Sequence, residues 1–480
     1  MSDALDRATA ALRDADLHRR HGRVIDLIGL IVEATGLEAE VGEVCTIETG
    51  RGRGPVGAEV VGFRAGRTLL MPLGEATGIG PGARVSASGR ALSVEVSDDL
   101  LGRTLDGLGR PLDGFGPAAG GRDSHPRPVE ASPPDPFTRP RIVDRVSLGV
   151  RALDALVPCG RGQRLGIFAG SGVGKSSLLG MIARSTSADV NVICLVGERG
   201  REVREFIERD LGPEGMARSV VIVATSDQPA LVRIKAAFTA TTIAEHFRDQ
   251  GADVMLMMDS VTRFAMAQRE VGLAIGEPPA TRGYTPSVFA LLPKLLERSG
   301  TSPRGSITGL YTVLVDGDDM NEPIADAVRS ILDGHVVLSR SLAHSGHYPA
   351  VDILASVSRL VGEVVTSEVR AAGDEVRRLM AAYRDKADLI AIGAYARGSD
   401  PLTDAAIDAR SPIDGFLRQT VADRSTAEEA DSALINLALL AGVPDPAAAP
   451  DPVVEPAPPA APQQPGMPLH SAIPPLHLAS

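Results

Sequence analysis

A stretch of nine residues, 169–177, combines three glycines, a lysine and three serines in an order suited to binding phosphate. Glycines let a backbone curl until several N–H groups point at one anion. Lys175 adds a full positive charge toward the outer phosphates of a nucleotide, and Ser176 offers a hydroxyl group to Mg²⁺. The pattern usually opens with glycine where this chain has Ala169, but the three glycines that follow keep the loop flexible. The residues expected to contact the nucleotide here are Gly170, Ser171, Gly172, Val173, Gly174, Lys175, Ser176 and Ser177.

The flanks of this stretch support the same interpretation. An apolar run, residues 165–168, leads into it, and a helix-forming run, residues 178–184, leads out. Strand, glycine-rich loop and helix form the context that a phosphate-binding loop requires, and the helix N-terminus adds its positive dipole end. A glycine–serine turn with a surface lysine is the alternative, and it would need neither flank.

A carboxylate closes a second apolar run. Residues 255–258 are Met, Leu, Met and Met, and Asp259 follows them. In enzymes with a phosphate loop, such an aspartate holds Mg²⁺ through water or a hydroxyl group. Asp259 could instead cap the N-terminus of the next helix. Its separation from Lys175 along the chain favours the magnesium role.

Charged residues also follow the first strand after the loop. Glu198 and Arg199 come directly after an apolar run, residues 190–196, and one glycine. A carboxylate at a neighbouring strand end can orient and polarise an attacking water, so Glu198 is the predicted general base. Arg199 is placed to contact the outer phosphate. A solvated charged turn explains the same residues equally well on local sequence alone.

The composition excludes several classes of protein. A net charge of −12 and a pI near 5.3 oppose a dedicated nucleic-acid binder. Tryptophan is absent and aromatic residues make up 3%, so platforms for stacking bases are scarce. Three scattered cysteines show neither disulfide nor metal spacing, which favours a reducing cytosol. The N-terminus lacks the apolar core of a signal peptide, and no stretch is long and apolar enough to span a membrane. We therefore expect a cytoplasmic protein whose contact with a membrane, if any, is peripheral.

The elements that must position these residues divide the chain into six segments. Short strands with turn signals in residues 22–97 predict a small β-barrel, with strands at 41–47, 58–63 and 68–71 after the apolar run 24–32. Residues 142–365 alternate between apolar strands and helices, which predicts a mostly parallel sheet covered on both faces, with ligands at the carboxyl ends of its strands. The expected strands are 165–168, 190–196, 219–224, 254–258 and 310–315, and the expected helices include 228–248 and 288–298.

The other segments are simpler. Residues 1–21 form an N-terminal extension in which 3–17 read as a short amphipathic helix or, equally, as a frayed terminus. Residues 98–141 read as a turn-rich connector whose proline-rich part wraps over the surface. Residues 366–442 predict a helical domain with helices at 367–396 and 404–418. The Pro/Ala-rich tail, residues 443–480, has a composition that cannot bury a core, so it is predicted to be disordered.

The motifs together resemble those of the rotary and secretion ATPase superfamily, which contains the F-type ATP synthase alpha and beta subunits. Within it, the chain most resembles the flagellar and type III secretion export ATPases. The resemblance spans about residues 20–425 and is carried by residues 169–176, 197–202, 278–289, 317–326 and 347–353. It implies an α/β architecture with an N-terminal β-barrel, a central RecA-like nucleotide-binding domain and a C-terminal helical domain.

The resemblance also assigns roles residue by residue. Glu198 matches the glutamate that activates water, and Arg199 and Arg263 match arginines near the outer phosphate. Tyr348 matches the tyrosine that stacks on adenine. Arg359 matches the arginine finger that reaches the nucleotide of the neighbouring subunit, where a cation stabilises the charge that accumulates on the γ-phosphate. Without the resemblance, Arg359 would read as a surface arginine at a strand end.

These assignments imply an ATP-hydrolysing export ATPase that uses ATP and Mg²⁺, forms a homohexamer with nucleotide sites between subunits, and promotes the unfolding and delivery of export substrates. Implied partners are regulator or stator proteins, stalk proteins and substrate–chaperone complexes at the cytoplasmic membrane, without nucleic acid. A rotary synthase would need a second kind of chain with its own phosphate loop. An RNA translocase would need a basic, aromatic barrel, whereas Phe63 is the one aromatic residue in 22–97. Flagellar and injection-type systems share every motif, so that choice stays open.

Overall fold

The computed structural model describes residues 21–440 except 51, 118–120, 122, 316 and 318. The predicted N-terminal helix at 3–17 and the predicted disordered tail at 443–480 lie outside the described residues. Among the described residues, no helix combines the length and the apolar character that crossing a bilayer demands.

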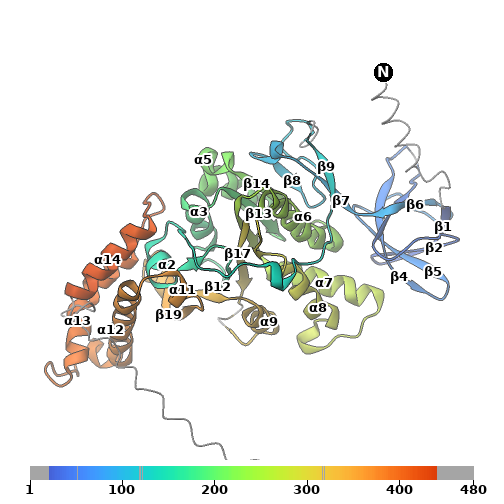
Figure 1. Ribbon diagram of the computed structural model, residues 1–480. Helices are drawn as coiled ribbons and strands as arrows, with labels where there is room; N and C mark the ends of the chain where they lie inside the picture. Colours follow the sequence, from blue (N-terminus) through green and yellow to red (C-terminus); the bar gives the residue numbers. More distant parts are fainter. Residues whose placement is uncertain are drawn as a thin grey trace, which may run out of the picture. The chain divides into compact units, whose positions relative to one another are not determined.

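Six strands at the N-terminal end close into a barrel (Figure 1). They are β1 (His21–Ile28), β2 (Ile31–Thr35), β3 (Glu43–Ile47), β4 (Val56–Arg64), β5 (Arg67–Pro72) and β6 (Arg84–Ala91), in the order β1-β2-β5-β4-β3-β6. The apolar run 24–32 is a hairpin rather than one strand, because Gly29 turns the chain with a φ of 61°. Val32, Val60 and Leu70 point inward and fill the barrel core.

The central domain is built on one large sheet in the order β19-β18-β12-β17-β15-β13-β14-β8, with β16 beside β17. All neighbours in this sheet are parallel except β19 and β16, which are antiparallel to β18 and β17. The strands are β8 (Thr104–Asp106), β12 (Arg164–Ala169), β13 (Val190–Val196), β14 (Ser219–Ala224), β15 (Asp253–Asp259), β16 (Gly300–Thr301), β17 (Ser306–Leu314), β18 (Gly334–Leu338) and β19 (Val351–Ser358).

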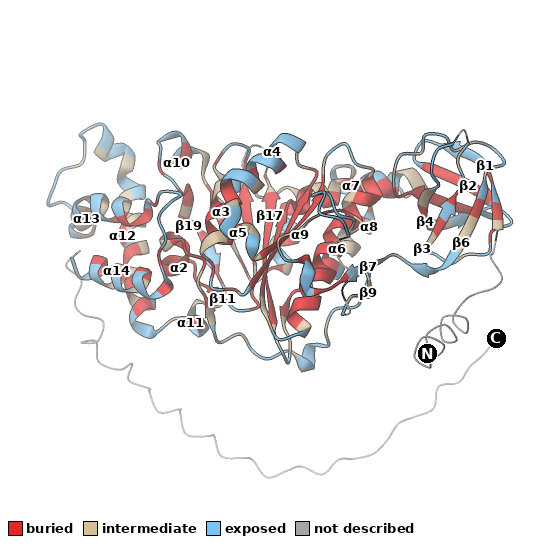
Figure 2. Ribbon diagram, turned by 90° about the horizontal axis from the view of Figure 1, so that it is seen from above, coloured by how far each residue is buried: buried red, intermediate tan, exposed pale blue. Residues whose placement is uncertain are grey.

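Helices cover both faces of this sheet, and its strands are buried in Figure 2. Alternate residues of β13 enter different cores: Cys194 packs with α6 (Ala230–Asp249), α7 (Val261–Ile275) and α8 (Pro286–Leu296), whereas Ile193 and Leu195 pack with α2 (Arg151–Leu156) and α3 (Lys175–Ser185). This two-sided burial explains the continuous apolar runs in the sequence. Shorter helices are α4 (Gly200–Glu205), a π-helical turn η3 (Phe206–Leu211), α5 (Gly212–Ala217), α9 (Pro323–Ile331), α10 (Arg340–His344) and α11 (Val361–Val364), with 3₁₀ turns η1 (Asp98–Leu100), η2 (Pro136–Thr138) and η4 (Thr281–Gly283).

Three helices follow the sheet: α12 (Ser367–Ala391), α13 (Pro401–Leu417) and α14 (Ala427–Leu440). Their apolar faces pack on one another and on α2 through Val376, Ile413 and Leu434. The first two lie near the predicted spans, and the third was not predicted. With the barrel and the mostly parallel sheet, these helices confirm the fold class expected from the sequence.

The connector, predicted to be rich in turns, also contains short strands. β8 lies within it and extends the main sheet beside β14, and β9 (His125–Pro128) pairs with β7 (Ser93–Val96). β8 has only three residues and one of them, Leu105, is buried, so it leaves no periodic signal. The remaining short pair is β10 (Arg145–Val146) with β11 (Cys159–Gly160).

A buried lysine joins the barrel to the central domain. Lys235 on α6 has a side chain that is only 3% exposed, and its Nζ lies 2.6 Å from a carboxylate oxygen of Glu59 on β4. The same Nζ donates a 2.6 Å hydrogen bond to Glu130 of the connector. Burial raises the pKa of Glu59, whereas the Lys235 charge acts to lower it. The ammonium is therefore what makes the buried Glu59 carboxylate tolerable.

Replacing Lys235 with methionine should lower the free energy of unfolding by about 3–5 kcal/mol, because the Glu59 carboxylate would stay buried without its cation. The loss should shrink as the pH falls, since protonation removes the uncompensated charge. Urea unfolding followed by circular dichroism at two pH values measures both effects.

The matched control is Glu130→Gln. Its side chain is 61% exposed, so its loss should cost less than about 1 kcal/mol. Equal destabilisation by the two substitutions would show that the Lys235–Glu59 pair does not hold the barrel in place.

Candidate active site

The strand order brings the predicted catalytic residues together at the carboxyl ends of the parallel strands. β12, β15 and β13 are parallel, and β17 lies between β12 and β15. Lys175 follows β12 through the phosphate loop, Asp259 ends β15, and Glu198 comes two residues after β13. Residues far apart in the sequence therefore meet at the carboxyl ends of adjacent strands, where parallel sheets bind ligands.

The Lys175 ammonium lies between the two carboxylates. Its Nζ is 2.5 Å from Oδ1 of Asp259 and 3.6 Å from Oε1 of Glu198. The three side chains are 5–17% exposed, so water screens their charges only weakly. One cation thus faces two anions in a mostly buried setting.

A hydroxyl group on the neighbouring strand fixes Asp259. Thr312 Oγ1 on β17 donates a 2.7 Å hydrogen bond to Oδ1 of Asp259. The alternative role considered for Asp259, as the cap of the next helix, is wrong. Ser260 caps α7, because its Oγ accepts the N–H of Arg263 at 3.3 Å. The Asp259 carboxylate is therefore directed to Lys175 rather than to a helix end.

The electrostatic setting of Glu198 suits a proton acceptor. Burial raises the pKa of Glu198 to about 7, and the charge of Asp259 adds to the rise, whereas Lys175 acts to lower it. A hydrogen bond and the negative charge of Glu202 raise the pKa further. A general base works best when its pKa lies near the operating pH.

The phosphate loop curls through two left-handed glycines. Gly172 and Gly174 have φ values of 77° and 89°, and Gly174 is the residue from which α3 starts. A side chain at Gly174 would also approach the ring of Tyr348, whose Cε1 lies 3.4 Å from the position of such a Cβ. The ring of Tyr348, about half exposed, therefore lies beside the start of the phosphate-loop helix.

The two predicted phosphate-contacting arginines differ in their surroundings. The Arg199 side chain is 73% exposed and 3.5 Å from Glu202. Arg263 packs against Gly197, where an added Cβ would come within 2.9 Å of it. Among the described residues, the buried Nε of Arg263 has no hydrogen-bond partner. Arg263 therefore carries an unpaired buried donor beside Gly197, the residue before Glu198.

Arg359 lies at the amino ends of the parallel strands, on the side of the sheet away from the phosphate loop. β19 runs antiparallel to β18. Val351 therefore pairs with Leu338 at the carboxyl end of β18, and Ser358 pairs with Gly334 at its amino end. β19 has eight residues, so Val351 and Ser358 at its two ends lie about 23 Å apart at the usual rise per residue. Arg359 follows Ser358 and is exposed. The structure thus separates Arg359 from the phosphate loop of its own chain.

Two residues that the sequence did not single out also belong to this arrangement. Thr312 holds Asp259, and its polar side chain inside an apolar strand was an available signal. Glu202 raises the pKa of Glu198, but its place in a charged stretch hid it.

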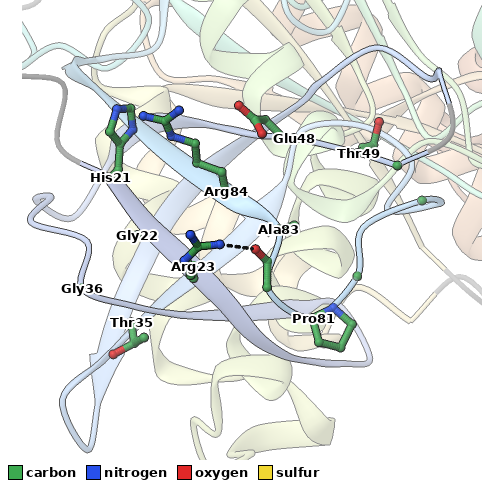
Figure 3. A pocket seen from close by; sticks show the side chains of 14 residues that line it. His21, Gly22, Arg23, Thr35, Gly36, Glu48, Thr49, Pro81, Ala83 and Arg84 are labelled. Carbon is green, nitrogen blue, oxygen red and sulfur yellow. Dashed lines mark hydrogen bonds between the residues drawn. The ribbon is translucent and has the colours of Figure 1, made fainter.

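The barrel contains a hollow of about 940 Å³ that is separate from this arrangement (Figure 3). It is lined by His21, Arg23, Glu48, Arg84 and several glycines, and by no residue of the phosphate loop. Arg23 donates to the carbonyl oxygen of Gly82 at 3.2 Å.

Family models match three successive parts of the chain. The beta-barrel domain of the ATP synthase alpha/beta family matches residues 24–89, and its nucleotide-binding domain matches residues 149–358. The C-terminal domain of the T3SS EscN ATPase matches residues 365–436.

Individual relatives extend over most of the chain. The flagellum-specific ATP synthase of Bacillus subtilis (strain 168) is 55% identical over 423 residues, 88% of this chain and 96% of that protein. The type 3 secretion system ATPase of Xanthomonas euvesicatoria is 49% identical over 93% of this chain and 98% of its own. The structure of the assembled ATPase EscN from the enteropathogenic E. coli type III secretion system matches with a TM-score of 0.82 and 48% identity, over 87% of this chain and 100% of that one. This chain therefore belongs to the flagellar and type III secretion export ATPases of the ATP synthase alpha/beta family.

Proposed function

We propose that this ATPase works as a homohexameric ring that hydrolyses ATP between subunits and delivers substrates to a flagellar or type III export apparatus. The observation that carries the proposal is the position of four side chains. Lys175, Asp259 and Glu198 lie at the carboxyl ends of the parallel strands, and Arg359 lies at their amino ends. A single chain then presents two different halves of a site. A ring of identical chains can join these halves at every interface.

The roles at such an interface follow from charge and position. Lys175, Arg199 and Arg263 are the cations for the outer phosphates, and the neighbour's Arg359 adds charge when the terminal phosphoryl group is transferred. Glu198 accepts a proton from the attacking water. The ring of Tyr348, beside the start of α3, provides a face on which adenine can stack.

Ser176 and Asp259 offer a hydroxyl and a carboxylate oxygen, the ligand types that Mg²⁺ takes in nucleotide sites. Mg²⁺ keeps several waters and needs few protein ligands, so these two residues suffice beside phosphate oxygens. The bound ion would neutralise phosphate charge. Asp259 already contacts Lys175, so a cation beside Asp259 would leave the ammonium available to phosphate.

The partners that we propose follow the relatives. EscN has been solved in complex with its central stalk EscO, and a stalk protein is the corresponding partner here. We further propose regulator or stator proteins and substrate–chaperone complexes as partners, no nucleic acid, and a cytoplasmic location peripheral to the membrane.

The pH dependence of ATP hydrolysis should reveal Glu198. The unprotonated form is the active base, and its pKa is raised to about 7, so kcat/KM should fall about tenfold per pH unit below neutrality. Glu202→Gln removes a hydrogen bond and a charge that raise this pKa, so the acidic limb should move to lower pH. Profiles at saturating Mg²⁺ measure the shift.

Glu208→Gln is the control for the pH profile, because Glu208 pairs with Arg204 at 2.7 Å and does not contribute to the Glu198 pKa. Its profile should match the parent. A limb that stays in place in the Glu202 variant would remove Glu198 from the role of base.

Mixed rings should test the shared site. Lys175→Ala rings should be inactive, and Arg359→Ala rings should lose about 10³-fold in kcat. In equal mixtures, Arg359→Ala chains supply intact phosphate loops and Lys175→Ala chains supply intact fingers, so about a quarter of the interfaces should be complete. ATP hydrolysis after co-assembly should therefore recover to a comparable fraction of the parent rate.

A Lys175→Ala chain mixed with a double variant lacking both Lys175 and Arg359 forms no complete interface and should stay inactive. Mixtures of the two single variants that form rings but recover nothing would contradict the trans arrangement.

The export role can be tested in the host cell. Replacing the chromosomal copy with Glu198→Gln should abolish or strongly reduce the export substrates in the medium, while the variant protein accumulates normally. Substrate identity, filament or needle components, then tells which system is served. Undiminished secretion would contradict the proposed role.

A further inference from the structure

The loop that follows α13, residues 418–424, lies against the nucleotide-binding elements. Its second residue, Gln419, is 4% exposed. A buried amide of this kind is retained in a loop when its donors and acceptors are satisfied. The partners of Gln419 therefore show what the loop holds in place.

Gln419 bonds to three separate segments. Its backbone N–H donates to the carbonyl oxygen of Tyr348 at 3.0 Å. Its Oε1 accepts the N–H of Arg151 at 2.9 Å, and its Nε2 donates to the carbonyl oxygens of Gly149 at 2.9 Å and Asp423 at 3.2 Å. The side chain is thus fixed to the start of α2 while the main chain holds Tyr348.

Other bonds tie the same loop to the far end of the phosphate-loop helix. Arg184, in the last turn of α3, donates to the carbonyl oxygen of Val421 at 2.9 Å. Arg151 donates to the carbonyl oxygen of Arg418 at 2.5 Å. The ring of Tyr348 lies beside Gly174, at the beginning of α3. The 418–424 loop therefore meets one end of α3 directly and the other end through Tyr348.

We propose that Gln419 is a positioning residue for the nucleotide base: its side chain anchors the 418–424 loop so that its main chain holds Tyr348 where adenine stacks. The inference rests on the role of Tyr348 in the proposed function. Loss of the side-chain anchor leaves the backbone N–H present but free to move with the loop. The lysine, the carboxylates and the phosphate loop have no bond to Gln419, so the chemistry of the phosphates should be spared.

The test separates base binding from phosphate binding. Gln419→Met fills a similar volume without the amide, and Gln419→Ala removes the side chain. Both should raise the KM for ATP about tenfold, as the loss of one to two buried hydrogen bonds implies, with kcat changed less than about twofold. The inhibition constant of inorganic tripolyphosphate, which has no base, should stay at the parent value.

Arg424→Ala is the matched control in the same loop. Arg424 pairs with Glu214 at 2.7 Å, with both side chains more than half exposed, and among the described residues neither has a hydrogen bond or ion pair with Tyr348 or α2. Its KM for ATP and its tripolyphosphate inhibition constant should both stay at the parent values. A KM increase as large as that of Gln419→Met would show that any disturbance of the loop suffices, which would overturn the specific role of Gln419.

Tyr348→Ala distinguishes the two levels of the argument. If it leaves the KM for ATP unchanged, the adenine role in the proposed function fails. If it raises the KM while Gln419→Met does not, the positioning inference alone fails. If Gln419→Met weakens ATP and tripolyphosphate equally, Gln419 is a general structural residue and the inference is overturned.

Discussion

The competition of two carboxylates for one ammonium group underlies the whole candidate site. Asp259 is 2.5 Å from Nζ of Lys175 and Glu198 is 3.6 Å from it. Asp259 also accepts a hydrogen bond from the hydroxyl group of Thr312. Glu198 is left with burial and like charges, which raise its pKa to about 7. The surroundings of Glu198 thus give it the pKa of a proton acceptor near neutral pH.

This arrangement depends on the strand order more than on any local motif. A parallel strand buried on both faces must be apolar along its length, so its polar residues gather at its ends. The order β12-β17-β15-β13 brings three such ends together and puts Thr312 on the strand between two of them. The antiparallel strand β19, the outermost strand of the sheet, separates residues instead. Tyr348 precedes it at the carboxyl ends of the parallel strands, and Arg359 follows it at their amino ends.

The phosphate loop and the central strands could be predicted from the sequence, for identifiable reasons. The phosphate loop is a local structure with fixed glycine positions, and the central strands are continuous apolar runs between helices. The three-residue β8 was missed because a strand with one buried side chain has no period. Gln419 was invisible because its partners, Gly149, Arg151 and Tyr348, lie far away in the sequence, and an amide after an ordinary helix carries no pattern. The position of Arg359 at the amino ends of the parallel strands could not be predicted, because it depends on the direction of β19, which strand periodicity does not encode.

The direction of β19 gives the C-terminal helices a hold on both halves of the proposed site. Gln419 bonds to Tyr348 just before the strand begins. Within the strand, Arg377 on α12 donates to the carbonyl oxygens of Ile353 and Ser356 at 2.5 and 3.4 Å, and it also donates to that of Leu156 on α2 at 2.6 Å. A shift of these helices would therefore act on Tyr348, before the strand, and on Ile353 and Ser356 within it. In the proposed ring, the Tyr348 end would serve the chain's own nucleotide and the Arg359 end its neighbour's, so β19 would link adjacent sites.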